Sequence, residues 1–530
     1  MTTPGGLSAT SPNDQFSYAS QIAPNGSQTI QPSAAGFPVG TPPSVVVTDA
    51  LGNPVKDISV TFAVASGGGS ATGTLATTDV SGVATVGSWI LGTTPGSNTL
   101  TASGSNLTNS PVTFTAVGNV GPAATIAPNG GDNQIVDAGT AVGTPPSVVV
   151  TDAFNNPVVG VSVTFSVFSG GGSVAGGPVL TDASGIATAG TWTLGATPGP
   201  NTLRAAVSGL SGSPVSFDAT GSVGPAAAIL LNGGDGQSAT VGTAVSTDPS
   251  VLVTDAFSNP VQGVSVTFSV TLGGGSVSGG NATTNASGIA TVSSWTLGAT
   301  PGSNTLQATA SGLFGSPVSF SATGKVGAAT TIAPNGGDGQ TATAGTAVAI
   351  DPSVLVTDAH GNPVQGASVT FSAASGGGSV SGGNTTTDAS GVATVGSWTL
   401  GGTAGANTLQ ATSDSLSGSP VVFNATGTVG QASTIAVNDG TGQSATAGTA
   451  VGTPPSVLVT DGHDNPVPGV TVTFAVDLGN GAVSGGVATT DGSGVATVGS
   501  WTLGDPGLNT LTATADGLAG SPLTFSATGL

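Results

Sequence analysis

The tryptophans of this chain define its organisation. The sequence contains five of them, and each follows the previous one by 103 residues: Trp89, Trp192, Trp295, Trp398 and Trp501. A period of this length is the size of an independently folding domain, well above the roughly 20 to 50 residues of solenoid repeats and propeller blades. We therefore predict five copies of one module, arranged like beads on a string. Function is then to be sought in the array rather than in one pocket.

The blocks around each tryptophan have the character of β-strands. A β-branched run that ends in Asp, residues 43–49 in the first copy, is followed by a turn that closes with Asn-Pro and then by a Val-Thr-Phe block. Within that block, alternation puts Val60 and Phe62 on one side and Thr61 and Ala63 on the other, as in a half-buried strand. Counting such blocks gives about seven or eight short strands per module, with turn signals about every 8 to 12 residues, which is typical of a β-sandwich.

Taken in order, these blocks resemble the bacterial immunoglobulin-like domains of the invasin and intimin type, called Big-1. The shared pattern is Val-Thr-Asp-x-x-x-Asn-Pro-Val-x-Gly-Val-x-Val-Thr-Phe, then Gly-Gly-Gly-Ser, then Thr-Thr-Asp-x-Ser-Gly-Val-Ala-Thr. Residues 150–190 carry nearly all of it, and the resemblance covers all five modules. In that family such domains form stiff extracellular stalks, and receptor contact usually belongs to a distinct terminal domain. No divergent terminal module is evident in this sequence, so the resemblance implies the stalk function and not the adhesive one.

The predicted fold is all-β, a linear array of five immunoglobulin-like β-sandwich domains joined by very short linkers. Only about two to four residues separate the last strand of one module from the first strand of the next, too few for a floppy linker. The expected divisions are a disordered leader at 1–17 and domains at 18–119, 120–222, 223–325, 326–428 and 429–530.

The charge of the chain excludes two classes of partner. The net charge is −21, every acid is Asp, and the only cations are Lys56, Arg204 and Lys325. Nucleic acids and anionic membrane surfaces require clustered Lys or Arg, so neither is predicted as a partner. No apolar run reaches the roughly 18 residues that could span a bilayer, so no membrane insertion is expected. The predicted partners are neighbouring domains of a longer surface protein or copies of this chain. We expect an extracellular or cell-surface location, although residues 1–17 have no features of a signal peptide.

The repeated aromatic residues are predicted to fill the module cores. Each tryptophan lies in an alternating strand among Val and Leu, and a large aromatic ring is the usual centre of a small sandwich. The predicted core residues are Trp89, Trp192, Trp295, Trp398, Trp501, Phe62, Phe165, Phe268, Phe371 and Phe474. The alternative is a sugar-stacking platform on each module, which needs several exposed aromatics close together. Aromatic residues make up only 4% of the chain, which favours the core.

Calcium is the one ion for which the sequence offers candidates. Asp132, Asp235 and Asp338 lie in Gly-Gly-Asp-x-Gln loops near the starts of three modules. Calcium takes about six to eight oxygen ligands, whereas no module has a dense Asp cluster and Glu is absent. An Asp in such a turn, like the recurring Asp at Asp49 and its equivalents, more often caps the turn with its own side chain. We therefore predict no metal site and no cofactor, and keep calcium as a weak alternative at these three positions.

Nothing in the sequence predicts catalysis. His360 and His463 each occur in a single module, at a turn position that we align with Gly52, Asn155 and Ser258, and we interpret them as tolerated surface substitutions. No Ser-His-Asp set, metal-ligand cluster or carboxylate pair recurs in the modules. We therefore predict that the protein is not an enzyme and has no catalytic residues.

The leading hypothesis for function is a structural stalk that projects another domain from a bacterial cell. Each sandwich should be about 40 Å long, so five in line reach about 200 Å. Two alternatives remain open. One is a self-assembling extracellular filament subunit, in which strands are exchanged between sandwiches. The other is an array of glycan-binding modules.

Overall fold

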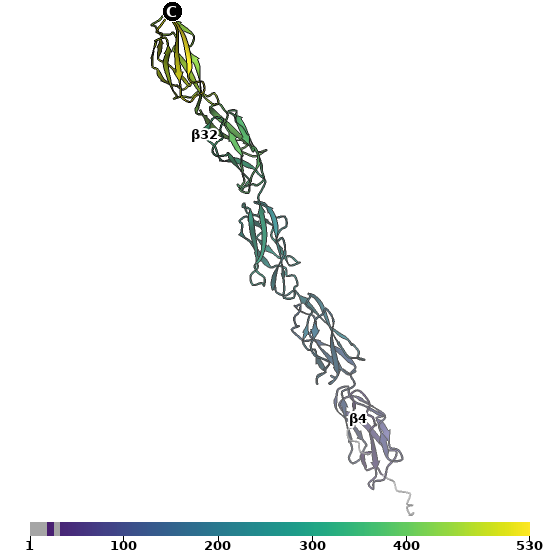
Figure 1. Ribbon diagram of the computed structural model, residues 1–530. Helices are drawn as coiled ribbons and strands as arrows, with labels where there is room; N and C mark the ends of the chain where they lie inside the picture. The colour runs from purple at the N-terminus through teal and green to yellow at the C-terminus, as the bar shows by residue number, and fades with distance from the viewer. Residues whose placement is uncertain (1–17, 26–31) are drawn as a thin grey trace, which may run out of the picture.

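The chain forms a rod of five β-sandwich modules. In the computed structural model, which describes residues 18–25 and 32–530, the modules follow one another along a single line (Figure 1). Regular structure in this part of the chain is strand, and it includes no helix long and apolar enough to cross a membrane. The expected leader at 1–17 lies outside the described residues.

The second module shows the arrangement of strands. Three sheets make it up. The first has the order β11 (Thr125–Gly130), β13 (Ser147–Thr151) and β17 (Ile186–Thr188). The second has the order β12 (Gln134–Asp137), β20 (Val215–Ser222), β19 (Gly199–Ala206), β14 (Ser162–Ser169) and β16 (Val179–Leu180). The third pairs β15 (Ser173–Val174) with β18 (Trp192–Thr193). The β12–β20 pair is parallel, and the other strand pairs are antiparallel.

The same ten strands recur in the same order in every module. The strands β1–β10 span residues 21–119, β21–β30 span 228–325, β31–β40 span 331–428 and β41–β50 span 432–529. The predicted fold class, an array of immunoglobulin-like sandwiches with very short linkers, is confirmed. The strands fall inside the five expected domain ranges, whose limits stay predictions.

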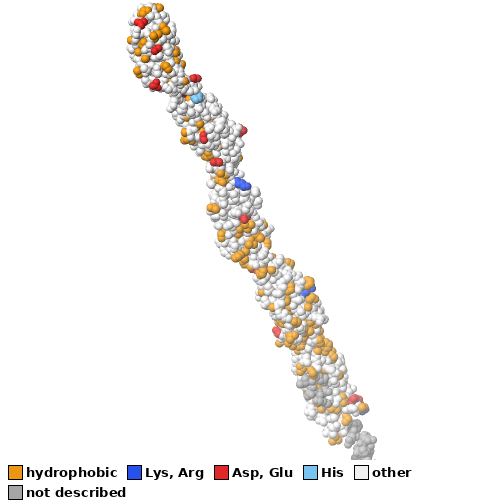
Figure 2. Space-filling model, viewed as in Figure 1, with side chains coloured by type: hydrophobic (Ala, Val, Ile, Leu, Met, Phe, Trp, Pro, Cys, Tyr) orange, Lys and Arg blue, Asp and Glu red, His pale blue; other side chains and the backbone are white. Residues whose placement is uncertain are grey.

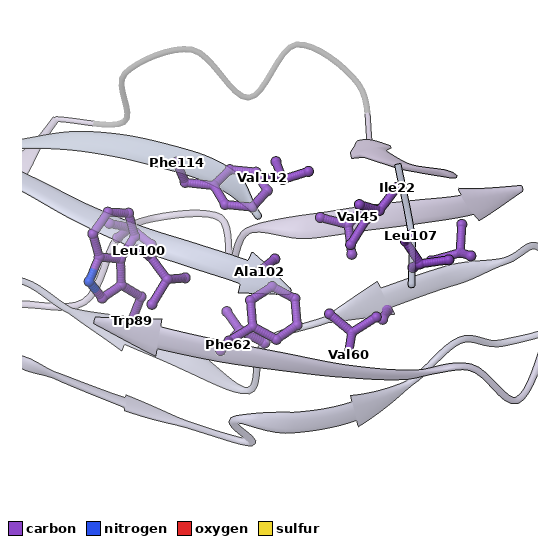
Figure 3. Packing of buried hydrophobic residues seen from close by; sticks show 14 of the residues in the cluster. Ile22, Val45, Val60, Phe62, Trp89, Leu100, Ala102, Leu107, Val112 and Phe114 are labelled. Carbon is purple, nitrogen blue, oxygen red and sulfur yellow. The ribbon is translucent and has the colours of Figure 1, made fainter. Parts of the chain in front are cut away.

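The aromatic residues singled out in the sequence lie in the cores. In the first module, β4 (Ser59–Ser66) and β8 (Ser88–Ile90) supply Phe62 and Trp89, each 1% exposed. Figure 3 shows Trp89 at one end of the labelled cluster, beside Leu100, with Phe62 further along it. The other predicted core residues are buried in the same way: Trp192, Trp295, Trp398, Trp501, Phe165, Phe268, Phe371 and Phe474. The alternation on β4 is also observed, because Val60 and Phe62 are buried while Thr61 and Ala63 are exposed.

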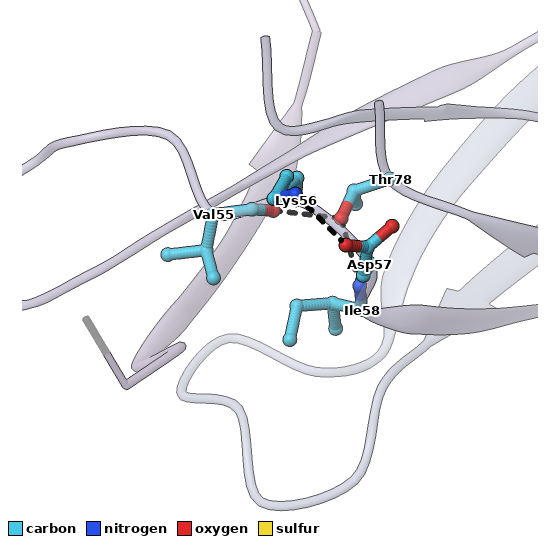
Figure 4. A network of polar contacts seen from close by, with 5 residues as sticks. All are labelled: Val55, Lys56, Asp57, Ile58 and Thr78. Carbon is cyan, nitrogen blue, oxygen red and sulfur yellow. Dashed lines mark hydrogen bonds and ion pairs between the residues drawn. The ribbon is translucent and has the colours of Figure 1, made fainter. Parts of the chain in front are cut away.

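A buried threonine ties the turn after each Asn-Pro pair to the sandwich. The hydroxyl of Thr78 donates to the Val55 carbonyl at 2.7 Å and accepts from the Ile58 amide at 2.9 Å (Figure 4). Lys56 and Asp57 form an ion pair at 3.4 Å in the same picture. Both of those side chains are well exposed, so the pair contributes little. The threonine contact recurs at Thr181, Thr284, Thr387 and Thr490.

The indole N–H groups have no hydrogen-bond acceptor among the described residues, although all five are buried. An unpaired buried donor costs about 1–3 kcal/mol. The tryptophans therefore stabilise the modules through the apolar area and the shape of their rings. The unpaired N–H group reduces this stabilisation.

This balance predicts different outcomes for two substitutions at one tryptophan. Trp295→Ala should destabilise the third module by about 3–5 kcal/mol, because it leaves a large cavity. Trp295→Phe should cost clearly less, because it keeps an aromatic ring and removes the unpaired N–H. Differential scanning calorimetry should show one module melting early while the other four keep their transition, since stability in such arrays is roughly a sum of module and neighbour terms. Equal damage by both substitutions would contradict this account of the indole N–H.

Candidate functional site: the joints between modules

The loop that follows the central strand of each three-stranded sheet lies at a joint between modules. In the second module this loop starts at Asp152, directly after β13, and ends at Asn156. One carboxylate oxygen of Asp152, Oδ1, accepts from the backbone amides of Phe154 at 2.8 Å and Asn156 at 2.9 Å. This is the turn-capping role that the sequence predicts for Asp at this position.

The second oxygen of the same carboxylate fixes the linker. Asp152 Oδ2 accepts from the backbone amide of Gly121 at 2.9 Å, and also from Asn156 Nδ2 at 2.9 Å. Gly121 precedes the first strand of the second module, so this bond holds the residue that connects the modules. The linker contact recurs at 2.8 to 3.1 Å in the pairs Gly224–Asp255, Gly327–Asp358 and Gly430–Asp461.

The asparagine at the end of the loop reaches the preceding module. Asn156 Nδ2 donates to the carbonyl of Thr93, a residue of the first module, at 2.8 Å. The equivalent bonds, also 2.8 Å, are Asn259 to Ala196, Asn362 to Ala299 and Asn465 to Gly402. Because the carboxylate of Asp152 orients the amide from its own module, Asn156 presents its second N–H at a fixed angle. Each joint is therefore clamped by a side chain that is itself held in place.

A ring from the same loop covers a glycine of the preceding module. Phe154 lies on Gly36 and packs edge-on against Phe37, with 6.1 Å between ring centroids and 80° between ring planes. A Cβ atom on Gly36 would overlap the Phe154 ring. The glycine also has φ of 77°, in the left-handed region that favours glycine over other residues. The other joints repeat this contact with Phe257 on Gly139, His360 on Gly242 and His463 on Gly345.

The two histidines therefore belong to the joints. His360 and His463 stand two residues after Asp358 and Asp461, as Phe154 stands two residues after Asp152. Our alignment of these histidines with Gly52, Asn155 and Ser258 is wrong by one residue. Both rings are exposed on one side, as expected for surface residues, but they contact the module before them. Counting from the recurring Asp would have placed them correctly.

In the first module the Asp-to-Asn loop has the same internal hydrogen bonds although it contacts no preceding module within the described residues. Asp49 accepts from the amides of Leu51 at 2.8 Å and Asn53 at 2.9 Å, and from Asn53 Nδ2 at 3.1 Å. Asn53 and Leu51 are exposed, whereas Asn156 is buried by the first module. The loop keeps one conformation in both settings, so little ordering of the chain has to accompany closure of a joint.

The carboxylates at the joints are held in their charged form. Burial raises the pKa of Asp152, but hydrogen bonds from the Asn156 side chain and from the amides of Asn156, Gly121 and Phe154 outweigh it, so the net pKa is below its usual value. The same balance lowers the pKa of Asp358 and of Asp461 to about 2. Neutral donors alone stabilise these charges, which suits a chain with only three cations.

The three calcium candidates hold loops against the five-stranded sheets. Asp132 Oδ1 accepts from the backbone amide of Asp218 at 2.8 Å. The equivalent bonds, both 2.7 Å, join Asp235 to Ser321 and Asp338 to Asn424. Within 18–25 and 32–530, no group of three or more His, Cys, Asp or Glu residues could hold a metal ion. These contacts give the three aspartates a structural role, and calcium at these positions stays a hypothesis.

The tryptophan platform of the glycan hypothesis is wrong. All five rings are at most 1% exposed, so a sugar has no face on which to stack.

Comparisons with known proteins give structural similarity only. No family model and no curated protein matches the chain. A solved structure of FdeC, a broadly conserved Escherichia coli adhesin, is 23% identical, with a TM-score of 0.35, and covers 58% of this chain and 100% of its own. Invasin, a bacterial integrin-binding protein, is 17% identical, with a TM-score of 0.35 over 76% of this chain and 79% of its own. The protocadherin gamma-B4 extracellular domain is 13% identical, with a TM-score of 0.42 over 95% of this chain and 83% of its own. At these identities and scores, the likeness carries no argument about function.

The clamp predicts that one asparagine controls the stiffness of one joint. Asn259→Ala should remove the bond to Ala196 and weaken closure of the second joint by about 1 kcal/mol. Single-molecule FRET between dyes on modules two and three should show a broader distance distribution. The chain has no cysteine, so labelling sites can be introduced freely. Asn53→Ala is the matched control, because it removes the same bond to its own Asp but none to a preceding module. If Asn259→Ala leaves the distribution unchanged, the clamp does not hold the joint.

The pKa directions predict that the joints loosen in acid. The pKa values of Asp358 and Asp461 fall from an ordinary 3.8 to about 2, so these groups contribute stability in full above pH 3.8. That contribution is lost as the pH falls through about 2. Small-angle scattering should therefore report a stiff rod at pH 6 and a more flexible one near about pH 2. Tryptophan fluorescence at each pH would separate joint opening from module unfolding, and a rod equally stiff at both would contradict the prediction.

Proposed function

We propose that this chain is a stalk or spacer segment of a bacterial cell-surface protein of the adhesin type, and that it projects another domain away from the cell. The observation that carries the proposal is the repetition of the joint. All four joints have the same linker bond, the same asparagine clamp and a Phe or His ring over a glycine. A joint with three separate contacts resists bending in more than one direction, so each module passes its orientation to the next.

The surface of the rod supports a passive role. In the view of Figure 2 white atoms, which are backbone and uncharged polar side chains, predominate, orange hydrophobic groups are spread along the rod, and red and blue groups are few and isolated. Large clustered charges attract and steer charged partners, and this rod offers few charges of either sign. The resemblance of the sequence blocks to stalk domains of surface adhesins points in the same direction and suggests the extracellular location. Partners would then be neighbouring domains of a longer protein.

Negative-stain electron microscopy with and without millimolar calcium tests the proposal directly. We expect isolated, fairly straight particles about 200 Å long in both conditions, because five sandwiches of about 40 Å are clamped end to end. Long polymers would instead make the filament hypothesis primary. Rods that straighten only with calcium would return Asp132, Asp235 and Asp338 to the argument as ligands.

Removing one module offers a second check. Deletion of residues 223–325 should shorten the particle by about 40 Å without unfolding the rest, because it joins the second module to the fourth through an equivalent joint. The sequence on both sides of the cut follows the same pattern in each repeat, so the amide of the linker Gly327 would still donate to Asp358. A global loss of the thermal transition would argue against independent modules.

A further inference from the structure

The fifth module differs from the others on the face that would contact a following module. In modules one to four this face carries the carbonyl that accepts the bond from the clamping asparagine of the next module, as Gly402 does from Asn465. The residue just before that carbonyl is a glycine whose amide donates to a buried Asn of its own module. That glycine and Asn are six residues apart in the fourth module, Gly401 and Asn407, but five apart in the fifth, Gly504 and Asn509. The loop between them has therefore lost one residue. The change is a single position in a module that otherwise keeps the repeat, so the fifth module is not divergent in sequence.

The shorter loop occupies the acceptor of the clamp. By position, the carbonyl of Asp505 corresponds to that of Gly402, which accepts from Asn465 of the next module. In the fifth module, however, Asn509 Nδ2 donates to the Asp505 carbonyl at 2.8 Å. In the fourth module the equivalent Asn407 Nδ2 donates to the Gly405 carbonyl. Asn509 keeps the matching bond to the Gly507 carbonyl at 3.1 Å, so its bond to Asp505 is the one that the fifth module adds. The acceptor that an incoming asparagine would use thus already accepts one bond within the fifth module, and an incoming N–H would have to share the oxygen with Asn509.

The same face has acquired negative charge. Asp505 is exposed there, and the exposed Asp477 lines the same hollow beside it. The carboxylate of Asp505 accepts from Asn480 Nδ2 at 2.7 Å. Asn480 replaces a glycine found in the other four copies, Gly68, Gly171, Gly274 and Gly377. Every module of this repeat brings a charged Asp to its joint, as Asp461 does in the fourth joint. Docking such a module on the fifth would bring like charges together, which is unfavourable.

One part of the joint surface is unchanged. Gly448 has φ of 81° and open space above it, as the covered glycines of the earlier modules would have without their rings. The difference is therefore confined to the loop that accepts the clamp and to the charges beside it.

We propose that this face of the fifth module ends the series of joints: it does not accept the Asp-x-x-x-Asn loop of another module of this repeat, in the same chain or in a second copy. The rod is then polar, with unlike ends. In repeat proteins, capping units with a polar outer face serve the same purpose. The inference goes beyond the stalk function, which requires only the four joints described above.

A sixth module provides the test. Residues 429–530 are repeated directly after Leu530, once behind the native fifth module and once behind a grafted one. In the graft, the fourth module's Gly-Thr-Ala (402–404) replaces Asp505 and Pro506, and Asn480→Gly is added. Single-molecule FRET across the new joint measures its open-to-closed ratio. We expect this ratio to be about tenfold higher behind the native module, because the clamp is lost and like charges are added. The proposal would be overturned if the joint behind the native fifth module were as closed as the joint behind the grafted one.

The reciprocal exchange keeps the test decisive if the graft folds poorly. In the five-module chain, Asp-Pro replaces residues 402–404 together with Gly377→Asn. The fourth joint should open while the second, labelled in parallel as an internal control, stays closed. Near-UV circular dichroism would establish that both chains keep their packed tryptophans. A fourth joint that stays closed in a folded chain would show that the loop does not decide docking, and would overturn the proposal.

Discussion

One carboxylate organises each joint between modules. The Asp that follows the central strand of the three-stranded sheet caps its own turn with one oxygen, and with the other it holds the linker glycine and the asparagine clamp, as Asp152 does for Gly121 and Asn156. A charged acceptor that receives several N–H bonds makes stronger hydrogen bonds than a neutral one. The linker glycine, the clamping asparagine and the ring beside it are therefore fixed to the same module as the carboxylate.

The cores and the joints are stabilised by different physics. Each core is a buried cluster around one tryptophan, and its stability comes from apolar area and close packing. Each joint depends on directional hydrogen bonds made by a preformed loop and on one ring that covers a glycine. This division lets the array bend or break at a joint without unfolding a module, and it makes stiffness a property that single residues such as Asn259 can set.

Much of the fold was accessible from the sequence. The period of the tryptophans gave the number of modules, and the alternation of Val60 and Phe62 gave the buried face of a strand, because both signals are local and repeat five times. The joint was only half predicted. Asp49 and its equivalents were recognised as turn caps, but neither the bond from Asn156 to Thr93 nor the position of His360 on Gly242 was foreseen. These contacts join residues of different modules, and no short-range pattern records them.

The sequence by itself determined the repeat, the all-β class and the residues of the core, since hydrophobic periodicity and turn chemistry act between near neighbours in the chain. Only the tertiary structure decided which loop faces which module, and so that the clamp of Asn156 meets a carbonyl 63 residues away. It also decided the meaning of the one missing residue before Asn509. In the sequence that deletion is a minor irregularity. In three dimensions it turns the acceptor of the joint toward its own module, because the position of a backbone carbonyl depends on the path of the whole loop.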